Sequence, residues 1–123
     1  MKSRWIGALL FSFFFAEVAL AHGPKLGPNG GPVVHAGNYH VELVAKNTSL
    51  TVYLVNDADN AVDTKGYKAT GIFVIDGKPV RIELAPSGLN KMAGQSTVAL
   101  TNAPKGAVQI IAPSGNTAQA KFD

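Results

Sequence analysis

Short runs of alternating apolar and polar residues are the feature that most constrains this chain. Within residues 39–46, Val41 and Leu43 would share one face of an extended strand, and His40 and Glu42 would share the other. Similar runs recur along the sequence, and none has the 3.6-residue apolar spacing of an amphipathic helix. The pattern therefore predicts an all-β fold.

Turn residues divide these runs into seven or eight short strands. Two dipeptides, Gly37-Asn38 and Asp76-Gly77, are typical of tight hairpin turns. Short connections favour antiparallel pairing, and regular strand spacing is typical of an Ig-like β-sandwich, with a small barrel as the alternative. We expect this domain to span residues 33–123, with strands at 33–36, 39–46, 49–56, 67–75, 78–85, 95–101, 107–112 and 117–122.

The N-terminus has the three parts of a secretory signal peptide. A basic start precedes the apolar run 5–16, and Ala19-Leu20-Ala21 fits a cleavage site. The apolar run is shorter than the roughly 20 residues that a membrane-spanning helix needs. Residues 1–21 are therefore predicted to be removed, leaving a periplasmic protein without a membrane segment. The mature chain would begin with a Gly/Pro-rich leader, residues 22–32.

Composition excludes several classes of function. The chain has no cysteine, so it has no disulfide, thiolate metal site or cysteine nucleophile. Its formal charge is +3, and the sequence contains no run of basic residues. Both features argue against a nucleic-acid partner. The sequence motifs of serine hydrolases, phosphate-binding loops, dinucleotide folds and zinc proteases are missing. We therefore expect a binding protein rather than an enzyme.

Two histidines flank the first predicted turn. If Gly37-Asn38 is a two-residue turn, His35 lies opposite His40, with Cβ atoms roughly 4.5–5.5 Å apart on one face. Two imidazoles at that spacing can share a Cu(II), Ni(II) or Zn(II) ion, and Glu42 on the same face would add an oxygen ligand. The alternative is a solvated histidine pair with no metal.

His22 would become the first residue after signal cleavage. Its α-amine and imidazole Nδ1 could then chelate one ion, and another histidine would complete a set of three nitrogens suited to Cu(II). Pro24 has no amide N–H, which blocks the alternative mode through deprotonated backbone amides. The predicted metal ligands are thus His35, His40 and His22. The alternative is that a histidine at the first position is a coincidence and that His22 binds no metal.

Two further features have structural explanations. Met92 offers a thioether for Cu(I), but a single methionine more commonly fills a gap in a core. The polar loop at residues 57–66 contains acidic residues whose spacing fails for an EF-hand, so we expect a hairpin loop with Asx turns. Its oxygen-bearing side chains include Asp57, Asp59, Asn60 and Asp63.

The opening HGPKLGPNGGPVVHAGNYHVELVAK, with the later TVYLVNDADNAVDTKG and VRIELAPSGLNKMAG, carries a resemblance. It resembles small exported β-domain proteins of proteobacteria, and it is similar to the N-terminal periplasmic region of heavy-metal efflux adaptor subunits. The specific core is residues 29–44. The resemblance implies a periplasmic role near metal resistance and points to His35 and His40, with His22. It does not extend to the adaptor's helical hairpin and barrel domains.

Together these features predict a periplasmic protein that binds a transition metal, copper first. Nickel and zinc remain open. Its role would be metal buffering or delivery to an efflux component. The alternative is a metal-free Ig-like module that binds a partner protein through its strand edges.

Overall fold

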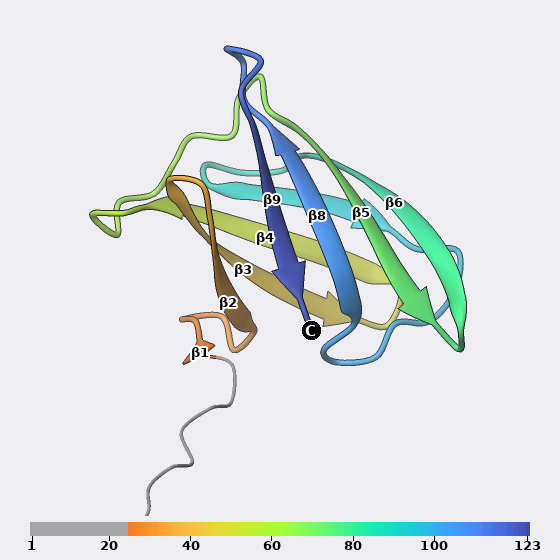
Figure 1. Ribbon diagram of the computed structural model, residues 1–123. Helices are drawn as coiled ribbons and strands as arrows, with labels where there is room; N and C mark the ends of the chain where they lie inside the picture. The colour runs from red at the N-terminus through yellow and green to blue at the C-terminus, as the bar shows by residue number, and fades with distance from the viewer. Residues whose placement is uncertain (1–24) are drawn as a thin grey trace, which may run out of the picture.

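A computed structural model describes residues 25–123, which form nine strands and no helix (Figure 1). The predicted signal peptide, residues 1–21, and His22 lie outside the described residues. Nothing in residues 25–123 is a helix long and apolar enough to cross a membrane. The strands are β1 (Lys25–Leu26), β2 (Pro32–Ala36), β3 (Tyr39–Lys46), β4 (Ser49–Asn56), β5 (Lys68–Ile75), β6 (Lys78–Pro86), β7 (Lys91–Gln95), β8 (Lys105–Ile111) and β9 (Thr117–Phe122).

The strands pair in the order β1-β2-β3-β4-β7-β6-β5-β8-β9, and every pair is antiparallel. β6 joins the two halves, since most of it pairs with β5 while Ala85 and Pro86 pair with β7. The sheet curls, so that β3 and β4 cross behind β9 and β8 (Figure 1). The all-β antiparallel prediction is confirmed. The strands form one continuous curled sheet rather than two separate sheets, and the Ig-like sandwich is not confirmed.

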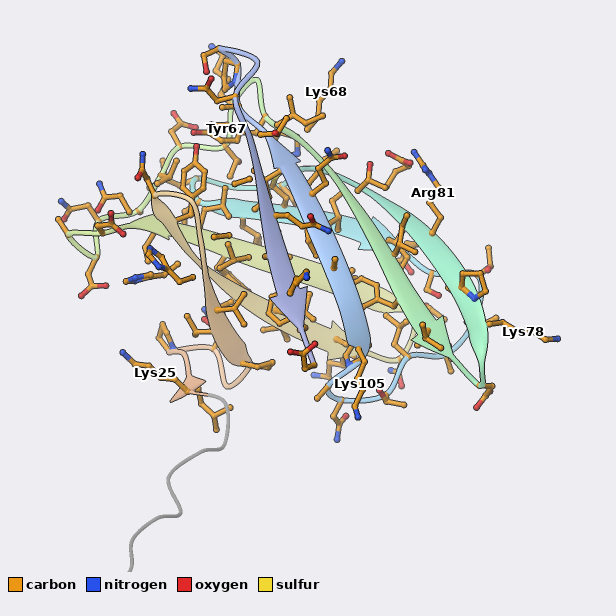
Figure 2. All side chains as sticks on the ribbon, viewed as in Figure 1. Lys25, Tyr67, Lys68, Lys78, Arg81 and Lys105 are labelled. Atoms are coloured by element: carbon orange, nitrogen blue, oxygen red, sulfur yellow. The ribbon has the colours of Figure 1, made fainter. Side chains whose placement is uncertain are left out.

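The core fills the space inside the curled sheet. Alternate residues of each long strand point inward, as the sequence pattern predicts, and the fully buried side chains include Leu43, Leu50, Leu54, Phe73, Ile82, Met92, Val108 and Ile110. Charged side chains such as Lys68 and Arg81 point away from the sheet (Figure 2). This alternation fixes which face of each strand is available to solvent.

Two glycines in neighbouring strands make room for the largest core side chain, Phe73. A Cβ on Gly71 would lie 2.5 Å from Phe73 Cε2, and a Cβ on Gly106 would lie 2.8 Å from Phe73 Cδ1. Gly106 also lies directly opposite Phe73 across β5 and β8. These isolated glycines are therefore explained by close packing against an aromatic ring.

The first hairpin has the register that the sequence predicts. Gly37 has a φ of 57°, and Ala36 pairs with Tyr39, so His35 pairs with His40. In the second predicted turn, Asp76 and Gly77 both have positive φ, at 53° and 77°, as a type I′ turn requires. The dipeptide turns therefore set the register of both hairpins.

The strand predicted at residues 95–101 is wrong, because the chain forms β7 earlier, at Lys91–Gln95. After Gln95 the backbone bonds to a turn instead, since the Ser96 amide donates to Thr48 O and the Leu100 amide donates to Asn47 O. Met92 lies opposite Val52 and is fully buried, so its predicted core role is confirmed. The leader also contributes a short strand, β1, that the sequence did not predict.

Candidate metal centre

His35 and His40 face each other across β2 and β3. Their ring centroids are 5.0 Å apart, and the ring planes are inclined at 66°. Both rings lie near the end of the hairpin, where the His35 side chain is 62% exposed and the His40 side chain is 34% exposed. The predicted juxtaposition of the two imidazoles is thus confirmed, at a place that solvent ions can reach.

A carboxylate completes this pair, and it comes from Asp57 just after β4. Asp57 Oδ1 lies 3.2 Å from His35 Nε2 and 3.9 Å from His40 Nε2. One ligand atom from each of the three residues lies within 4.8 Å of the other two. Two imidazole nitrogens and one carboxylate oxygen are a donor set for a first-row divalent ion, with coordination positions left open.

The loop after β4 holds Asp57 in place through an Asx turn. Asn56 Oδ1 accepts hydrogen bonds from the amides of Ala58, at 2.9 Å, and Asn60, at 3.0 Å. Asp59 takes a φ of 62°, which aspartate tolerates better than most residues, and its amide donates to Asn56 O. The predicted Asx turn is confirmed, and it explains why this loop is rich in Asn and Asp.

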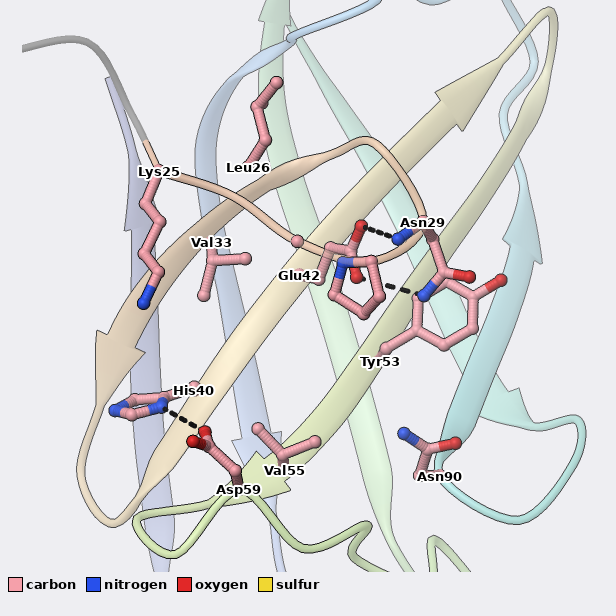
Figure 3. Close-up of a pocket in the computed structure, with 12 residues that line it drawn as sticks. Lys25, Leu26, Asn29, Val33, His40, Glu42, Tyr53, Val55, Asp59 and Asn90 are labelled. Atoms are coloured by element: carbon pink, nitrogen blue, oxygen red, sulfur yellow. Dashed lines mark hydrogen bonds and ion pairs between the residues drawn. The ribbon is translucent and has the colours of Figure 1, made fainter.

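Asp59 is the second carboxylate near the histidines. Its Oδ1 lies 3.6 Å from His40 Nδ1, an ion-pair distance rather than a hydrogen bond (Figure 3). This contact is on the nitrogen of His40 that does not face Asp57. A carboxylate on the far side of the imidazole from the ion is also found in carboxylate–histidine–metal arrangements.

Glu42 is not a free ligand, and this corrects the sequence prediction. Its side chain is buried, and Oε2 accepts hydrogen bonds from the amides of Asn29, at 2.8 Å, and Gly31, at 2.9 Å. Oε1 accepts a third bond, 3.0 Å long, from Asn29 Nδ2 (Figure 3). The leader folds over the outer face of β3 and occupies both oxygens. The prediction that Glu42 would add an oxygen ligand to the histidine pair is therefore wrong.

Glu83, on β6, is an exposed glutamate and contrasts with Glu42. Its carboxylate accepts a 2.7 Å bond from Arg81 Nε and a 3.0 Å bond from the Thr70 hydroxyl. The Arg81 guanidinium, and next the Thr70 hydroxyl, lower the pKa of Glu83. Glu42 and Glu83 both lie on the outer face of a strand. Their environments differ because the leader covers Glu42 and no other segment of residues 25–123 covers Glu83.

Two glycines of the leader allow it to lie so close to β3. A Cβ on Gly31 would lie 2.0 Å from the carbonyl oxygen of Leu43, and a Cβ on Gly27 would lie 2.5 Å from Glu42 Cδ. The Gly27 amide also donates to Gly31 O, which closes the turn. The Gly-rich composition of the leader therefore reflects close packing around a buried carboxylate.

A cavity of about 160 Å³ lies beside this turn (Figure 3). Its apolar walls include Leu26, Val33 and Val55. His40 and Asp59 line it, whereas His35 and Asp57 do not, so the cavity lies beside the candidate metal centre rather than over it.

Two tyrosines form a separate polar contact on the other side of the hairpin. Their hydroxyl oxygens, in Tyr39 and Tyr67, are 3.0 Å apart. Burial, and next the hydrogen bond to Tyr39, raise the pKa of Tyr67 to about 12. The Tyr67 phenol therefore stays neutral at physiological pH and is not a candidate metal ligand.

Comparisons with models of known protein families, with curated proteins and with solved structures find no match for this chain. The resemblance to efflux-adaptor regions thus stays a prediction. His22, the third predicted ligand, lies outside the described residues. The chemistry of His35, His40 and Asp57 is therefore the basis for a functional proposal.

Proposed function

We propose that this chain is an exported, periplasmic protein that binds a divalent transition-metal ion, copper first. The observation that carries the proposal is the convergence of His35 Nε2, His40 Nε2 and Asp57 Oδ1 at one end of the first hairpin. The histidines are placed by strand register and the carboxylate by an Asx turn. Two independent local structures, the β2–β3 hairpin and the Asx turn, thus bring three ligand atoms together.

The donor set favours Cu(II), with Ni(II) and Zn(II) as the other candidates. Among divalent first-row ions, copper binds a given nitrogen and oxygen site most tightly. The side chains of His35 and Asp57 are largely exposed, so bound ions can exchange with solvent or with a partner. An exchangeable site of this kind suits metal buffering or delivery to a periplasmic efflux component better than permanent storage.

His22 extends this proposal if signal peptidase cleaves after Ala21. The new α-amine and the His22 imidazole would supply two further nitrogens to an ion held by His35 and His40. Tetragonal nitrogen-rich ligation is the geometry that Cu(II) prefers. The intact mass of the exported protein tests the cleavage site, and a start other than His22 removes this part of the proposal.

The second candidate is a metal-free interaction module built on an Ig-like sandwich. It is favoured by two large apolar side chains on the outer face of β5, Ile72 at 47% exposure and Val74 at 57%. Exposed apolar side chains on the outer face of a strand suit a protein partner. In this case the histidines would be ordinary surface residues, and metal titration distinguishes the two candidates.

The test is titration of the mature protein with Cu(II), Ni(II) and Zn(II), repeated with His35→Ala, His40→Ala and Asp57→Asn. We expect each histidine variant to weaken Cu(II) binding at least tenfold, about 1.4 kcal/mol. Asp63→Asn is the matched control, because Asp63 lies in the same loop and its carboxylate accepts a bond from the Lys65 amide instead.

Two outcomes would reject the metal proposal. One is a dissociation constant weaker than about 0.1 mM, roughly −5.5 kcal/mol, for all three ions. The other is an affinity that the histidine variants leave unchanged.

A further inference from the structure

The cavity beside the candidate metal centre has a size and a lining that suit a small ligand. Its volume is about 160 Å³, and its apolar walls come from Leu26 and Pro28 of the leader, Val33 of β2 and Val55 of β4. An apolar cavity of about 150 Å³ is large enough to hold a benzene molecule. The cavity therefore has room for an apolar group of about four to six carbon atoms.

Two opposite charges lie at one end of this cavity, beside His40 (Figure 3). The Lys25 side chain points from β1 toward His40, and Asp59 Oδ1 lies 3.6 Å from His40 Nδ1. Among residues 25–123, no carboxylate lies within ion-pair distance of the Lys25 ammonium, and Asp59 is paired with no lysine or arginine. Both charged groups are exposed, so each is available to a ligand of the opposite charge.

The other polar residues of the cavity are already engaged or lie at its far end. Glu42 lines the cavity, but its oxygens accept hydrogen bonds from Asn29 and Gly31 of the leader. Tyr53 and Asn90 lie at the end away from Lys25 (Figure 3). The charges that can hold a ligand are therefore confined to the end near His40.

We propose that this cavity binds a free α-amino acid with an apolar side chain of about the size of leucine. The ligand's ammonium pairs with Asp59, its carboxylate pairs with Lys25, and its side chain lies between the apolar walls. A simple amine would satisfy Asp59 but would meet the like charge of Lys25, and a simple carboxylate would meet the like charge of Asp59. Only a ligand that carries both charges pairs with both groups.

This site goes beyond the proposed function, because it requires no metal ion. The two sites are nevertheless neighbours, since His40 lines the cavity and also belongs to the metal centre. Their tests can be kept apart by measuring amino-acid binding on metal-free protein.

The experiment is calorimetric titration of the mature protein after treatment with EDTA and dialysis. The probes are L-leucine, 3-methylbutylamine, which is leucine without its carboxylate, and 4-methylpentanoate, which is leucine without its ammonium. We expect leucine to bind at least about fivefold more tightly than either analogue, because each analogue loses one ion pair and keeps one repulsion. Glycine carries both charges without the side chain, and we expect it to bind at least about tenfold more weakly than leucine.

Two variants assign the charges to their residues. Lys25→Met keeps the aliphatic stem, and it should remove the preference for leucine over 3-methylbutylamine. Asp59→Asn places a residue that tolerates the φ of 62° at this position, and it should remove the preference for leucine over 4-methylpentanoate. Lys68→Met and Asp63→Asn are the matched controls, because they make the same chemical changes outside the cavity. Circular dichroism checks that each variant is folded.

Several outcomes would overturn the inference. One is a leucine affinity no higher than that of either analogue, and another is the absence of binding at about 10 mM leucine. Preferences that Lys25→Met and Asp59→Asn leave unchanged would also overturn it. All of these results would leave the metal proposal standing, since that proposal depends on the Cu(II) titrations of the His35 and His40 variants.

Discussion

Replacing Glu42 with glutamine is expected to lower the free energy of unfolding by about 2–3 kcal/mol. The Glu42 carboxylate is buried and accepts three hydrogen bonds from the leader. Bonds to a charged acceptor contribute roughly 1.5–3 kcal/mol each, and bonds between neutral groups roughly 0.5–1.5 kcal/mol. Glutamine keeps the shape of the side chain and one carbonyl oxygen, so about 1 kcal/mol is lost per bond.

Urea denaturation followed by circular dichroism measures this loss in the mature protein. Glu83→Gln is the matched control, because it makes the same chemical change at an exposed carboxylate paired with Arg81. Exposed ion pairs contribute little to stability, so the control should change the unfolding midpoint much less. A loss for Glu42→Gln no larger than that for Glu83→Gln would show that the buried three-bond contact does not stabilise the fold.

Three other predictions concern the metal centre, the core residue Met92 and the phenol of Tyr67. Reduction of Cu(II) to Cu(I) by ascorbate should weaken copper binding, since the centre offers imidazole and carboxylate rather than the sulfur that Cu(I) prefers. Competition with a chelator measures this, and equal affinities for the two oxidation states would contradict it. Met92→Ala should destabilise the protein by about 2–5 kcal/mol in urea and leave Cu(II) affinity unchanged, because Met92 is fully buried in the core; a change in affinity would place its sulfur at the centre instead. Stability should fall as pH rises from 10.0 toward about 12, because the raised pKa of Tyr67 means that the unfolded chain releases this proton first. Tyr67→Phe should flatten that part of the pH profile of thermal unfolding, and an unchanged slope would refute the assignment.

The register of the first hairpin could be predicted because two local patterns agree. Strand alternation assigns His40 to the outer face, and the Gly37-Asn38 turn then assigns His35 to the position opposite. Both patterns act over a few residues, so neither depends on the rest of the fold. The same reasoning gave the hairpin around Asp76-Gly77 correctly.

The contacts of the carboxylates could not be predicted in this way. Asp57 is 22 residues from His35 in sequence, and Glu42 is 13 residues from Asn29. Strand pairing across β2, β3 and β4 brings the first pair together, and the path of the leader brings the second. The only sequence signals were the Asx-turn composition of the loop at residues 57–66 and the glycines of the leader.

The curled sheet and β7 were missed for a related reason. Alternation shows that a strand has one buried face, but it does not show which strands are neighbours. β6 can join the two halves of the sheet because only its last residues, Ala85 and Pro86, pair with β7. Residues 95–101 have strand-like composition, yet the amides of Ser96 and Leu100 bond to the β3–β4 turn.

Environment, rather than residue type, divides the roles of the carboxylates near the histidine pair. Asp57 is exposed and its Oδ1 faces both Nε2 atoms, so it is available to an ion. Glu42 lies on the same strand face as His40, but binding an ion would leave the amides of Asn29 and Gly31 without an acceptor. The carboxylate closest to His40 along its strand is therefore held back from coordination.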